Sequence, residues 1–164
     1  MAVNYQLAQQ QFAMLYERNY KLVYRICYTY MKNQYDAEDC LEDVFVKVYS
    51  GNIEFNDESH EKAWLTVASI NTCKDHLKQF WRKKVVADEL IENRGVVRQK
   101  DNYLLQEVMN LPEKYKDVIY LHYYLGYKSE EIATMLKRTA STVRNQLAEG
   151  RKMLKVRLEE SEDE

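Results

Sequence analysis

The sequence is poor in the two residues that most often interrupt helices. Proline occurs once and glycine four times among 164 residues, and each is costly in a helix interior. Apolar residues recur at intervals of three and four positions through almost the whole chain, which is the spacing of one helix face. The sequence therefore predicts an all-α protein.

Long apolar runs are also missing. There is no run of 18 apolar residues, so we expect no membrane-spanning helix. The N-terminal segment MAVNYQLAQQQF lacks a basic stretch followed by an apolar one, so we expect no export signal. The three cysteines include no CxxC pair. Together these absences favour a cytoplasmic location.

Signs of catalysis and of a bound cofactor are absent too. The sequence contains no glycine-rich phosphate loop, no HExxH motif and no Ser/His/Asp constellation. Cys73 and His76 are spaced to share one helix face, but a zinc site needs three or four protein ligands. The remaining cysteines and histidines are scattered: Cys27, Cys40, His60 and His122. We therefore expect no metal, no cofactor and no enzyme activity, and we expect the cysteines to be small core residues.

Charge is distributed in blocks, although the net charge is only −2. Residues 137–157 include seven basic side chains and one acidic one, whereas 159–164 include five acidic and no basic ones. Residues 36–43 also include five acidic and no basic ones. Blocks of opposite charge on separate segments indicate separate partners for separate faces.

Three helices are expected in the N-terminal half, at about 4–33, 36–49 and 61–84, with Gly51 ending the second and 52–59 forming a loop. Each has an apolar stripe that we expect to be buried. The stripes are Phe12, Leu15, Val23, Ile26, Cys27 and Tyr30; then Ala37, Leu41, Val44 and Val48; then Ala63, Val67, Ile70, Leu77 and Trp81. Most of the fourteen tyrosines fall at stripe positions, and we expect them to pack helices together.

Residues 85–101 have weak periodicity and mixed charge, so we interpret them as a linker. Four further helices are expected after it, at about 102–110, 112–125, 130–137 and 140–159. Pro112 suits the first turn of the second of these helices. Ser129 and Thr139 are the expected N-caps of the third and fourth. The sequence thus predicts two small helical domains, 1–84 and 102–164, joined by a linker.

The segment SEEIATMLKRTASTVRNQLAEGRKML has the layout of a helix-turn-helix. Its expected inward residues are Ile132, Ala133, Leu136, Val143 and Leu147, and the small Ala133 permits close helix approach. The expected exposed residues at the start of the second helix are Ala140, Ser141, Thr142, Arg144, Asn145 and Gln146. A recognition helix presents such N-terminal residues to base edges in the major groove. Arginine can pair with guanine, and asparagine or glutamine with adenine.

The basic residues farther along the second helix, Arg151, Lys152 and Lys155, would contact phosphates, which position a protein on DNA without reading its sequence. A basic amphipathic helix is more often only a solvated surface helix. The two-helix pattern with its short turn and capping threonine favours DNA.

Four segments together resemble a known family. They are YDAEDCLEDVFVKVY, KAWLTVASINTCKDHLKQFWRKK, LPEKYKDVIYLHYYLGYKSEEIATML and STVRNQLAEGRKMLK. In this order and spacing they are similar to bacterial RNA polymerase sigma factors. The resemblance is to the small two-domain extracytoplasmic-function (ECF) type of the sigma-70 family, and it covers about residues 10–158.

The resemblance implies that the acidic helix at 36–49 docks on the coiled coil of the polymerase β′ subunit. Asp39, Glu42 and Asp43 take the matching positions, although members often have glutamine in place of Glu42. An exposed acidic face can meet a basic partner face and aid encounter and register. The alternative is an acid cluster that only complements the positive N-terminus of its own helix.

The resemblance also implies that WLTVASINTCKDHLK opens and reads the −10 promoter element. Asn71 matches a polar position near the pocket for a flipped base, and stacking and hydrogen bonds can offset the cost of flipping. The residues that would follow the strand's phosphates are Lys74, Lys78, Arg82, Lys83 and Lys84. Trp64 is expected in the core, whereas Trp81 fits either the core or a stacking role. Asn71 alone also fits an ordinary solvent-facing position.

The C-terminal half is similar to the domain that reads the −35 element as duplex DNA. The matching positions are held by Ser141, Thr142, Arg144, Asn145 and Gln146. The family often has arginine in place of Gln146, a basic residue in place of Glu149, and a turn glycine in place of Lys137.

The implied function is that of a sigma factor that directs promoter-specific initiation. The implied partners are core RNA polymerase (through its β′ coiled coil and β subunit), promoter DNA and an anti-sigma factor. Two alternatives remain. One is a sigma-like regulator that does not direct initiation, which would not need to bind polymerase. The other is a helical adaptor that binds proteins alone, which would show no salt-dependent DNA affinity.

Overall fold

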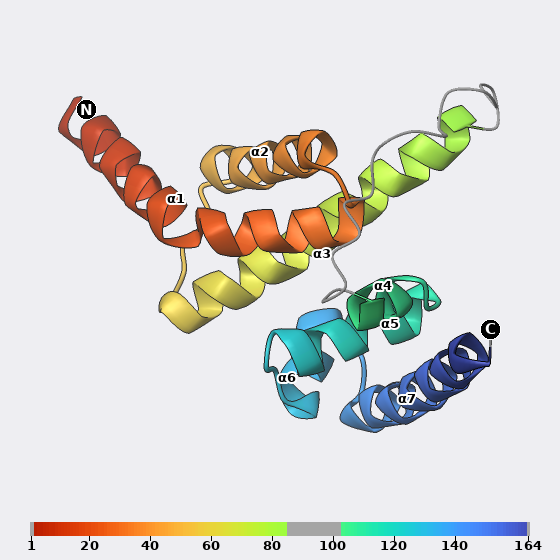
Figure 1. The fold of residues 1–164 in the computed structure, drawn as a ribbon. Helices are drawn as coiled ribbons and strands as arrows, with labels where there is room; N and C mark the ends of the chain where they lie inside the picture. The colour runs from red at the N-terminus through yellow and green to blue at the C-terminus, as the bar shows by residue number, and fades with distance from the viewer. Residues whose placement is uncertain (1, 85–102, 164) are drawn as a thin grey trace. The chain divides into compact units, whose positions relative to one another are not determined.

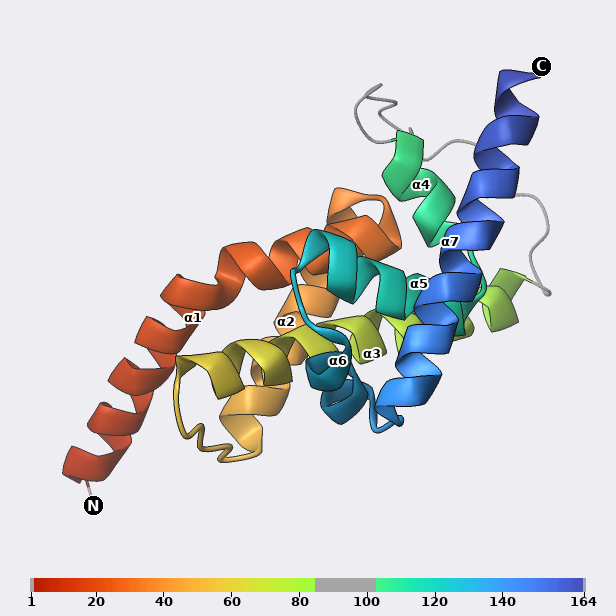
Figure 2. The ribbon, with the colours of Figure 1, turned by 90° about the horizontal axis from the view of Figure 1, so that it is seen from below.

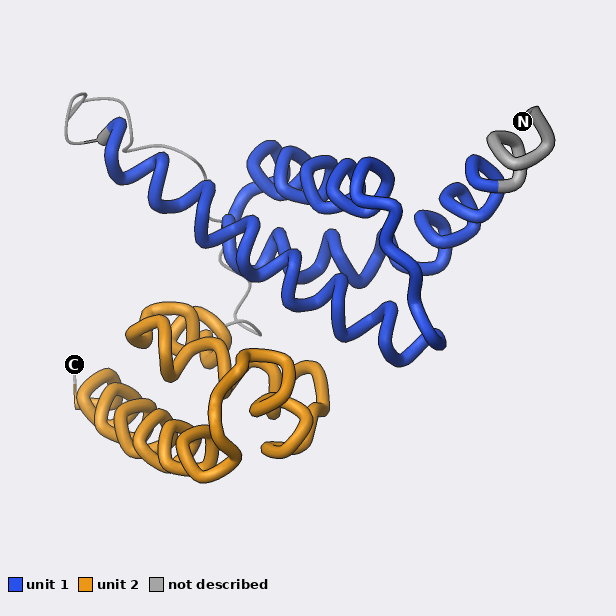
Figure 3. The backbone as a smooth tube through the Cα atoms, turned by 180° about the vertical axis from the view of Figure 1, so that it is seen from behind, with its two compact units in different colours: residues 1–96 blue, residues 97–164 orange. Residues whose placement is uncertain are grey.

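The computed structural model describes residues 2–84 and 103–163, with side chains described for 8–83 and 103–163. All regular elements in these ranges are helical, which confirms the predicted fold class. The chain divides into two compact units, residues 1–96 and 97–164 (Figure 3). The expected linker, 85–101, lies outside the described residues.

The first unit contains α1 (Ala2–Met31), α2 (Gln34–Ser50) and α3 (Glu58–Lys84), and each helix packs against the other two. Figure 1 shows α2 alongside the C-terminal half of α1, with α3 crossing both. The turn between α1 and α2 is tight because Lys32 adopts a left-handed conformation, with a φ of 65°. The side chain of Asn33 then caps α2 by accepting a hydrogen bond from the Asp36 N–H at 2.8 Å.

The predicted stripes of α1 and α2 largely form the core of this unit. The stripe residues that are buried are Leu15, Val23, Ile26, Cys27 and Tyr30 of α1 and Ala37, Val44 and Val48 of α2. Phe12 and Leu41 are partly exposed, while Cys40 and Phe45 are buried in addition. The three cysteines come together where the helices meet. Hydrogen bonding to Cys27 and Cys40, together with burial, raises the pKa of the Cys73 thiol, as expected for core thiols.

The predicted stripe of α3 is correct only in part. Ile70 is buried and Ala63, Val67 and Leu77 are partly buried, but Trp81 is 58% exposed. The face that packs inward is instead Leu65, Thr66, Ser69, Ile70, Thr72 and Cys73. A buried hydroxyl is tolerated where the helix itself accepts its hydrogen, and Ser69 donates to the Leu65 carbonyl at 2.6 Å. An apolar periodicity cannot reveal a buried face built partly from hydroxyl residues.

A polar cluster ties α1 to α3, with Glu61 and Asn19 buried and Arg18 exposed. Arg18 donates through Nε and Nη2 to the two carboxylate oxygens of Glu61, each at 2.8 Å. Asn19 is buried beside them and donates to both the Leu15 carbonyl and Glu61 Oε1. A buried carboxylate is stable when its oxygens are paired in this way.

The second unit contains α4 (Tyr103–Met109), α5 (Glu113–Ile119), the π-helical turn η2 (Tyr120–Tyr124), α6 (Ser129–Leu136) and α7 (Ala140–Glu162). Figures 1 and 2 show α4 and α5 lying alongside α7. The predicted helix at 112–125 is present as α5 continued by η2, with Pro112 as its N-cap residue. Gly126 follows at a φ of 78°, in the left-handed region that favours glycine.

The predicted cap of α6 is wrong, because Ser129 is already inside the helix and Lys128 is the N-cap residue. The backbone N–H groups at the start of a helix have no acceptor within the helix backbone. Here the Lys128 N–H donates to the Glu131 carboxylate at 3.0 Å, so a side chain of the first turn supplies the missing acceptor. The predicted cap of α7 is confirmed, since Thr139 Oγ1 accepts a hydrogen bond from the Thr142 N–H at 3.1 Å.

Candidate functional site

The exposed face of α2 is acidic. Asp39, Glu42 and Asp43 are all exposed, and their spacing of three and four positions places them on one side of the helix. The opposite side buries Ala37, Cys40, Val44, Phe45 and Val48. The charge of a helix N-terminus is felt only within its first turn, where Asp36 lies. Because Asp39, Glu42 and Asp43 lie beyond that turn, complementing the helix dipole does not account for them.

Asp43 is held by a side chain of α3. The Nε2 atom of His76 lies 2.6 Å from Asp43 Oδ2, and the two side chains are 28% and 53% exposed respectively. The contact fixes the direction of one carboxylate of the acidic face while leaving it accessible to solvent.

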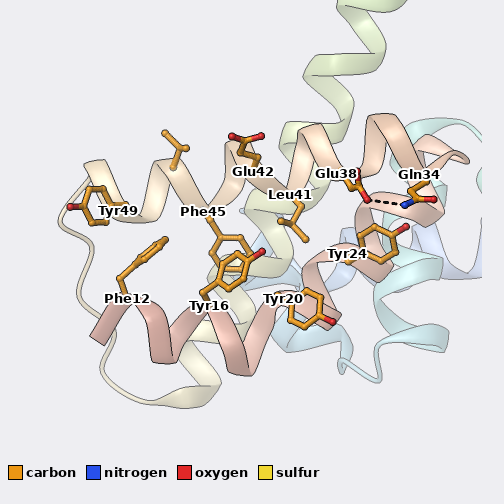
Figure 4. A pocket seen from close by; sticks show the side chains of 11 residues that line it. Phe12, Tyr16, Tyr20, Tyr24, Gln34, Glu38, Leu41, Glu42, Phe45 and Tyr49 are labelled. Atoms are coloured by element: carbon orange, nitrogen blue, oxygen red, sulfur yellow. Dashed lines mark hydrogen bonds between the residues drawn. The ribbon is translucent and has the colours of Figure 1, made fainter. Parts of the chain in front are cut away.

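An aromatic groove of about 930 Å³ lies beside the acidic face, between α1 and α2. Figure 4 shows its lining side chains, which are Phe12, Tyr16, Tyr20 and Tyr24 from α1 and Gln34, Glu38, Leu41, Glu42, Phe45, Val46 and Tyr49 from α2. Tyr16 packs on Phe45 with ring centroids 4.6 Å apart. Burial, and then the charge of Glu38, raise the pKa of Tyr24. Glu42 therefore belongs both to the groove and to the acidic face.

The sequence interpretation missed this groove, because it assigned the tyrosines to packing between helices. The available signal was the repeat of an aromatic residue at every fourth position from Phe12 to Tyr24. That repeat places the four rings on one side of α1.

The C-terminal part of α3 is basic. Asn71, Lys78 and Arg82 are exposed and Lys74 is partly exposed, and their spacing places these four residues along one side of the helix. Lys83 is exposed on a different side, and the side chain of Lys84 lies outside the described residues. The structure thus brings together four of the six residues predicted to contact the −10 element.

The two tryptophans lie in different environments. Trp64 is partly buried and packs edge-on against Phe55 of the preceding loop, with ring centroids 5.7 Å apart. The prediction that Trp64 lies in the core is therefore met only in part. Trp81 is largely exposed and meets Phe80 edge-on, with centroids 6.4 Å apart. Trp81 therefore does not belong to the core.

The helix-turn-helix is formed by α6 and α7. Ile132, Ala133, Val143 and Leu147 are buried, as predicted, and Leu136 is partly buried. Lys137 ends α6 in the left-handed conformation, with φ 55° and ψ 47°. The next residue, Arg138, donates its backbone N–H to the Ala133 carbonyl at 2.9 Å, which satisfies an orphan carbonyl at the helix end.

The N-terminal part of α7 presents polar side chains to solvent. The exposed members of the predicted set are Ser141, Thr142, Arg144, Asn145, Arg151, Lys152 and Lys155. Arg151 donates to the Tyr123 hydroxyl at 3.1 Å, and Lys152 lies 3.5 Å from the Glu149 carboxylate. Ala140 and Gln146 differ from the prediction because both are partly buried. The side chain of Gln146 accepts a hydrogen bond from Arg138 at 2.8 Å.

In the part of the chain that the structure describes, no helix is both long and apolar enough to cross a bilayer. Among the same residues, no group of three His, Cys, Asp or Glu side chains is arranged to hold a metal ion.

Two family models match the chain. Residues 15–83 match the model of sigma-70 region 2, and residues 101–154 match that of sigma-70 region 4. The first match spans the acidic face and the basic side of α3, and the second spans the helix-turn-helix.

The chain is also similar to curated proteins over most of its length. The RNA polymerase sigma factor SigV of Bacillus subtilis is 29% identical over 138 residues, which cover 82% of this chain and 83% of SigV. The ECF RNA polymerase sigma factor SigW of the same organism is 24% identical over 168 residues, which cover 92% of this chain and 90% of SigW.

Two solved structures share the fold. One is the sigma factor RpoE in complex with the anti-sigma factor NepR from Bartonella quintana, with a TM-score of 0.67 and 16% identity over 92% of this chain and 96% of that one. The other is CnrH in complex with the cytosolic domain of CnrY, with a TM-score of 0.67 and 19% identity over 92% and 89%.

Proposed function

Because the chain belongs to the sigma-70 family of RNA polymerase sigma factors, of the ECF type, we propose that its two units perform separate parts of promoter recognition. The chain binds core RNA polymerase and directs initiation at promoters that carry a −10 and a −35 element. The first unit binds the polymerase and the −10 element, and the second unit binds the −35 element. The observation that carries this assignment is that the exposed acidic face and the helix-turn-helix lie in different units.

Polymerase binding is assigned to the acidic face of α2 with its neighbouring groove. Asp39, Glu42 and Asp43 offer negative charge to a basic face of the β′ coiled coil, and charge complementarity of this kind steers association and sets register. Glu42 also lines the aromatic groove, so a helix of the coiled coil that contacts the acids can bury apolar side chains against Tyr16 and Tyr20. Aromatic side chains in such a position supply much of the energy of protein interfaces.

Reading of the −10 element is assigned to α3. Asn71 lies at the start of a line of basic residues, Lys74, Lys78 and Arg82, that runs toward the end of the helix. A basic groove or stripe follows the phosphates of a single strand, while neighbouring polar or aromatic groups receive its bases. Trp81, which is 58% exposed, is the aromatic residue that we assign to such stacking.

Reading of the −35 element is assigned to the N-terminal turns of α7. Ser141, Arg144 and Asn145 are exposed there, in the part of a recognition helix that reaches base edges. Lys152 and Lys155, farther along, provide contacts to phosphate.

The proposed function requires no chemistry from this chain, because the polymerase forms the RNA. We infer that the chain is not an enzyme and that it acts in the cytoplasm, where it meets polymerase and DNA. An anti-sigma factor is a further proposed partner, supported by the complex of the sigma factor RpoE with the anti-sigma factor NepR. A regulator that did not bind polymerase would have no need of the acidic face.

The decisive experiment is run-off transcription with purified core polymerase and this protein on a genomic promoter library. The expected result is transcripts that begin at discrete sites and share two upstream elements. Binding of the protein to core polymerase without any transcript would contradict the initiation function. Absence of core binding, with the protein folded by circular dichroism, would favour the regulator.

A further inference from the structure

We infer that Arg138, a residue of the turn, determines which hydrogen-bonding groups Gln146 presents to DNA, and thereby the base that is read at that position of the −35 element. This inference rests on the proposed function of α7. Gln146 Oε1 accepts a hydrogen bond from Arg138 Nη1 at 2.8 Å, across eight positions of sequence. The same Nη1 also donates to the backbone carbonyl of Lys114 in α5, at 3.2 Å.

The turn between α6 and α7 places Arg138 for this role. Lys137 takes the left-handed conformation, and Arg138 follows it with its N–H donated to the Ala133 carbonyl. The guanidinium thus extends from a fixed backbone and is held between α5 and α7. Arg138 is held by its backbone N–H and by the Lys114 carbonyl, so its side chain loses little further conformational entropy when it also binds Gln146.

The orientation of the Gln146 amide follows from the chemistry of the two side chains. A guanidinium has only donors, so it must face the amide oxygen of Gln146. The NH₂ group of Gln146 is then directed away from Arg138. Gln146 is only partly buried, so this donor group can reach a ligand placed against α7.

This orientation changes the base that Gln146 prefers. Adenine pairs bidentately with a glutamine that offers both its oxygen and its NH₂ group, since adenine presents one donor and one acceptor in the major groove. The oxygen of Gln146 keeps a second lone pair, but a donor placed there would lie beside the charged guanidinium of Arg138, so the NH₂ group is the part of Gln146 better able to contact a base. Guanine presents two acceptors and no donor on that edge, so Gln146 held by Arg138 prefers guanine over adenine. An arginine at position 146 could accept nothing from Arg138, so the pair depends on glutamine being present there.

The test compares base preferences of the full chain bound to core polymerase, with every position of the −35 element randomised. The wild-type protein is expected to prefer guanine at one position, and Gln146→Ala is expected to abolish the preference at that position alone. Arg138→Ala is expected to shift the same position toward adenine by about fivefold or more, the lower range for a bidentate base contact. Arg138→Lys, which retains a donor, is expected to restore part of the guanine preference.

A purely structural role for Arg138 would lower binding at all positions equally and leave the preferred base unchanged. That result in Arg138→Ala would overturn the inference, as would an unchanged preference in Gln146→Ala. The double variant Arg138→Ala/Gln146→Ala should match Gln146→Ala at this position, and an additive change would also count against the inference. Failure of the wild-type protein to support any initiation would instead be a failure of the proposed function.

Discussion

Arg18 of α1 and Glu61 of α3 form a two-point ion pair across 43 positions of sequence, with both donor–acceptor distances at 2.8 Å. The Glu61 side chain is 6% exposed, whereas that of Arg18 is 42% exposed. The pair, with Asn19, is a polar link between α1, which lines one wall of the aromatic groove, and α3, which carries the basic residues.

Replacing Glu61 is expected to destabilise the first unit. Glu61→Gln retains the shape but removes the charge, and it replaces one of the two oxygens that accept from Arg18 with an NH₂ donor. We expect a loss of about 2 kcal/mol, in the range for hydrogen bonds to charged groups and limited by the solvent exposure of Arg18. Urea unfolding followed by tryptophan fluorescence measures it, because both tryptophans lie in this unit. Glu54→Gln, an exposed loop carboxylate, is the control and should unfold with the wild-type protein.

The same pair predicts a pH dependence. The hydrogen bonds from Arg18 hold the pKa of Glu61 below its ordinary value, against the opposing effect of burial. A lowered folded-state pKa stabilises the protein above the unfolded pKa of about 4.3, and this stabilisation is lost as pH falls through the folded-state pKa. The stability difference between the wild-type protein and Glu61→Gln should therefore shrink as pH is lowered from about 6 to 3. A difference that stays constant with pH would rule out the ion pair as its cause.

Reversing one charge of the acidic face should weaken polymerase binding without unfolding the protein. For Asp43→Arg we expect about a tenfold loss of affinity for core polymerase, as for a charge placed against a complementary surface. Glu160→Arg makes the same charge change at an exposed position of α7 and should bind as the wild-type protein does. Equal affinity of both variants, measured by fluorescence anisotropy, would remove Asp43 from the interface.

The aromatic groove offers a matched pair of tyrosines on one helix. Tyr20 and Tyr28 are each 41% exposed on α1, but only Tyr20 lines the groove. If the β′ coiled coil occupies the groove, Tyr20→Ser should weaken core binding by about 1–2 kcal/mol, as for an aromatic interface residue. Tyr28→Ser should have little effect. Equal losses in the two variants would place the bound helix elsewhere.

Arg144 and Lys152 should differ in how they affect DNA recognition. Arg144→Ala is expected to cost about 1–3 kcal/mol and to relax the base preference at one −35 position. Lys152→Ala should weaken all sequences alike and reduce the salt dependence by about one unit of slope. Both are measured by promoter competition with the polymerase complex at several salt concentrations. Unchanged promoter selectivity in Arg144→Ala would assign that residue to phosphate contact or to none.

Lys137 carries a conformational cost that glycine would relieve. Its φ of 55° lies in the left-handed region, which costs a non-glycine residue about 1–2 kcal/mol. Glycine avoids this cost, but it loses more backbone conformational entropy on folding, which offsets part of the gain. Lys137→Gly should therefore stabilise the second unit by about 0.5–1 kcal/mol, as measured by amide hydrogen exchange in α6 and α7. Lys155→Gly, in the interior of α7, should instead destabilise it by about 1 kcal/mol. If both variants lost stability, the turn would not be the source of strain.

The sequence predicted most of the fold because most of its signals are local. Helix periodicity, the cap at Thr139 and the break at Gly126 each depend on residues within a turn of one another. The α3 stripe was correct only in part for a physical reason: Ser69 can be buried once its own helix accepts its hydrogen, so polarity along the sequence no longer reports burial.

The residues assigned to polymerase binding and to the −10 element came from a resemblance, whereas those of α7 assigned to DNA came first from the helix-turn-helix pattern. The structure adds that Asp39, Glu42 and Asp43 share an exposed face, and their roles in binding stay predictions. The groove beside them was missed because its walls come from two helices. Aromatic spacing on α1 alone does not show whether the opposing face is covered or open.

By itself, the sequence determined the helices, the helix-turn-helix and the family, because these depend on spacing and residue type along a continuous segment. Only the tertiary structure decided which groups meet. Arg18 reaches Glu61, Asp43 reaches His76, and Arg138 takes the oxygen of Gln146. Each contact joins residues of separate elements. Only folding brings such a donor and acceptor within the distance of about 3 Å that a hydrogen bond requires. For that reason the sequence alone could not show that the oxygen of Gln146, one of the two groups with which glutamine pairs with adenine, accepts a hydrogen bond from Arg138 in the folded protein.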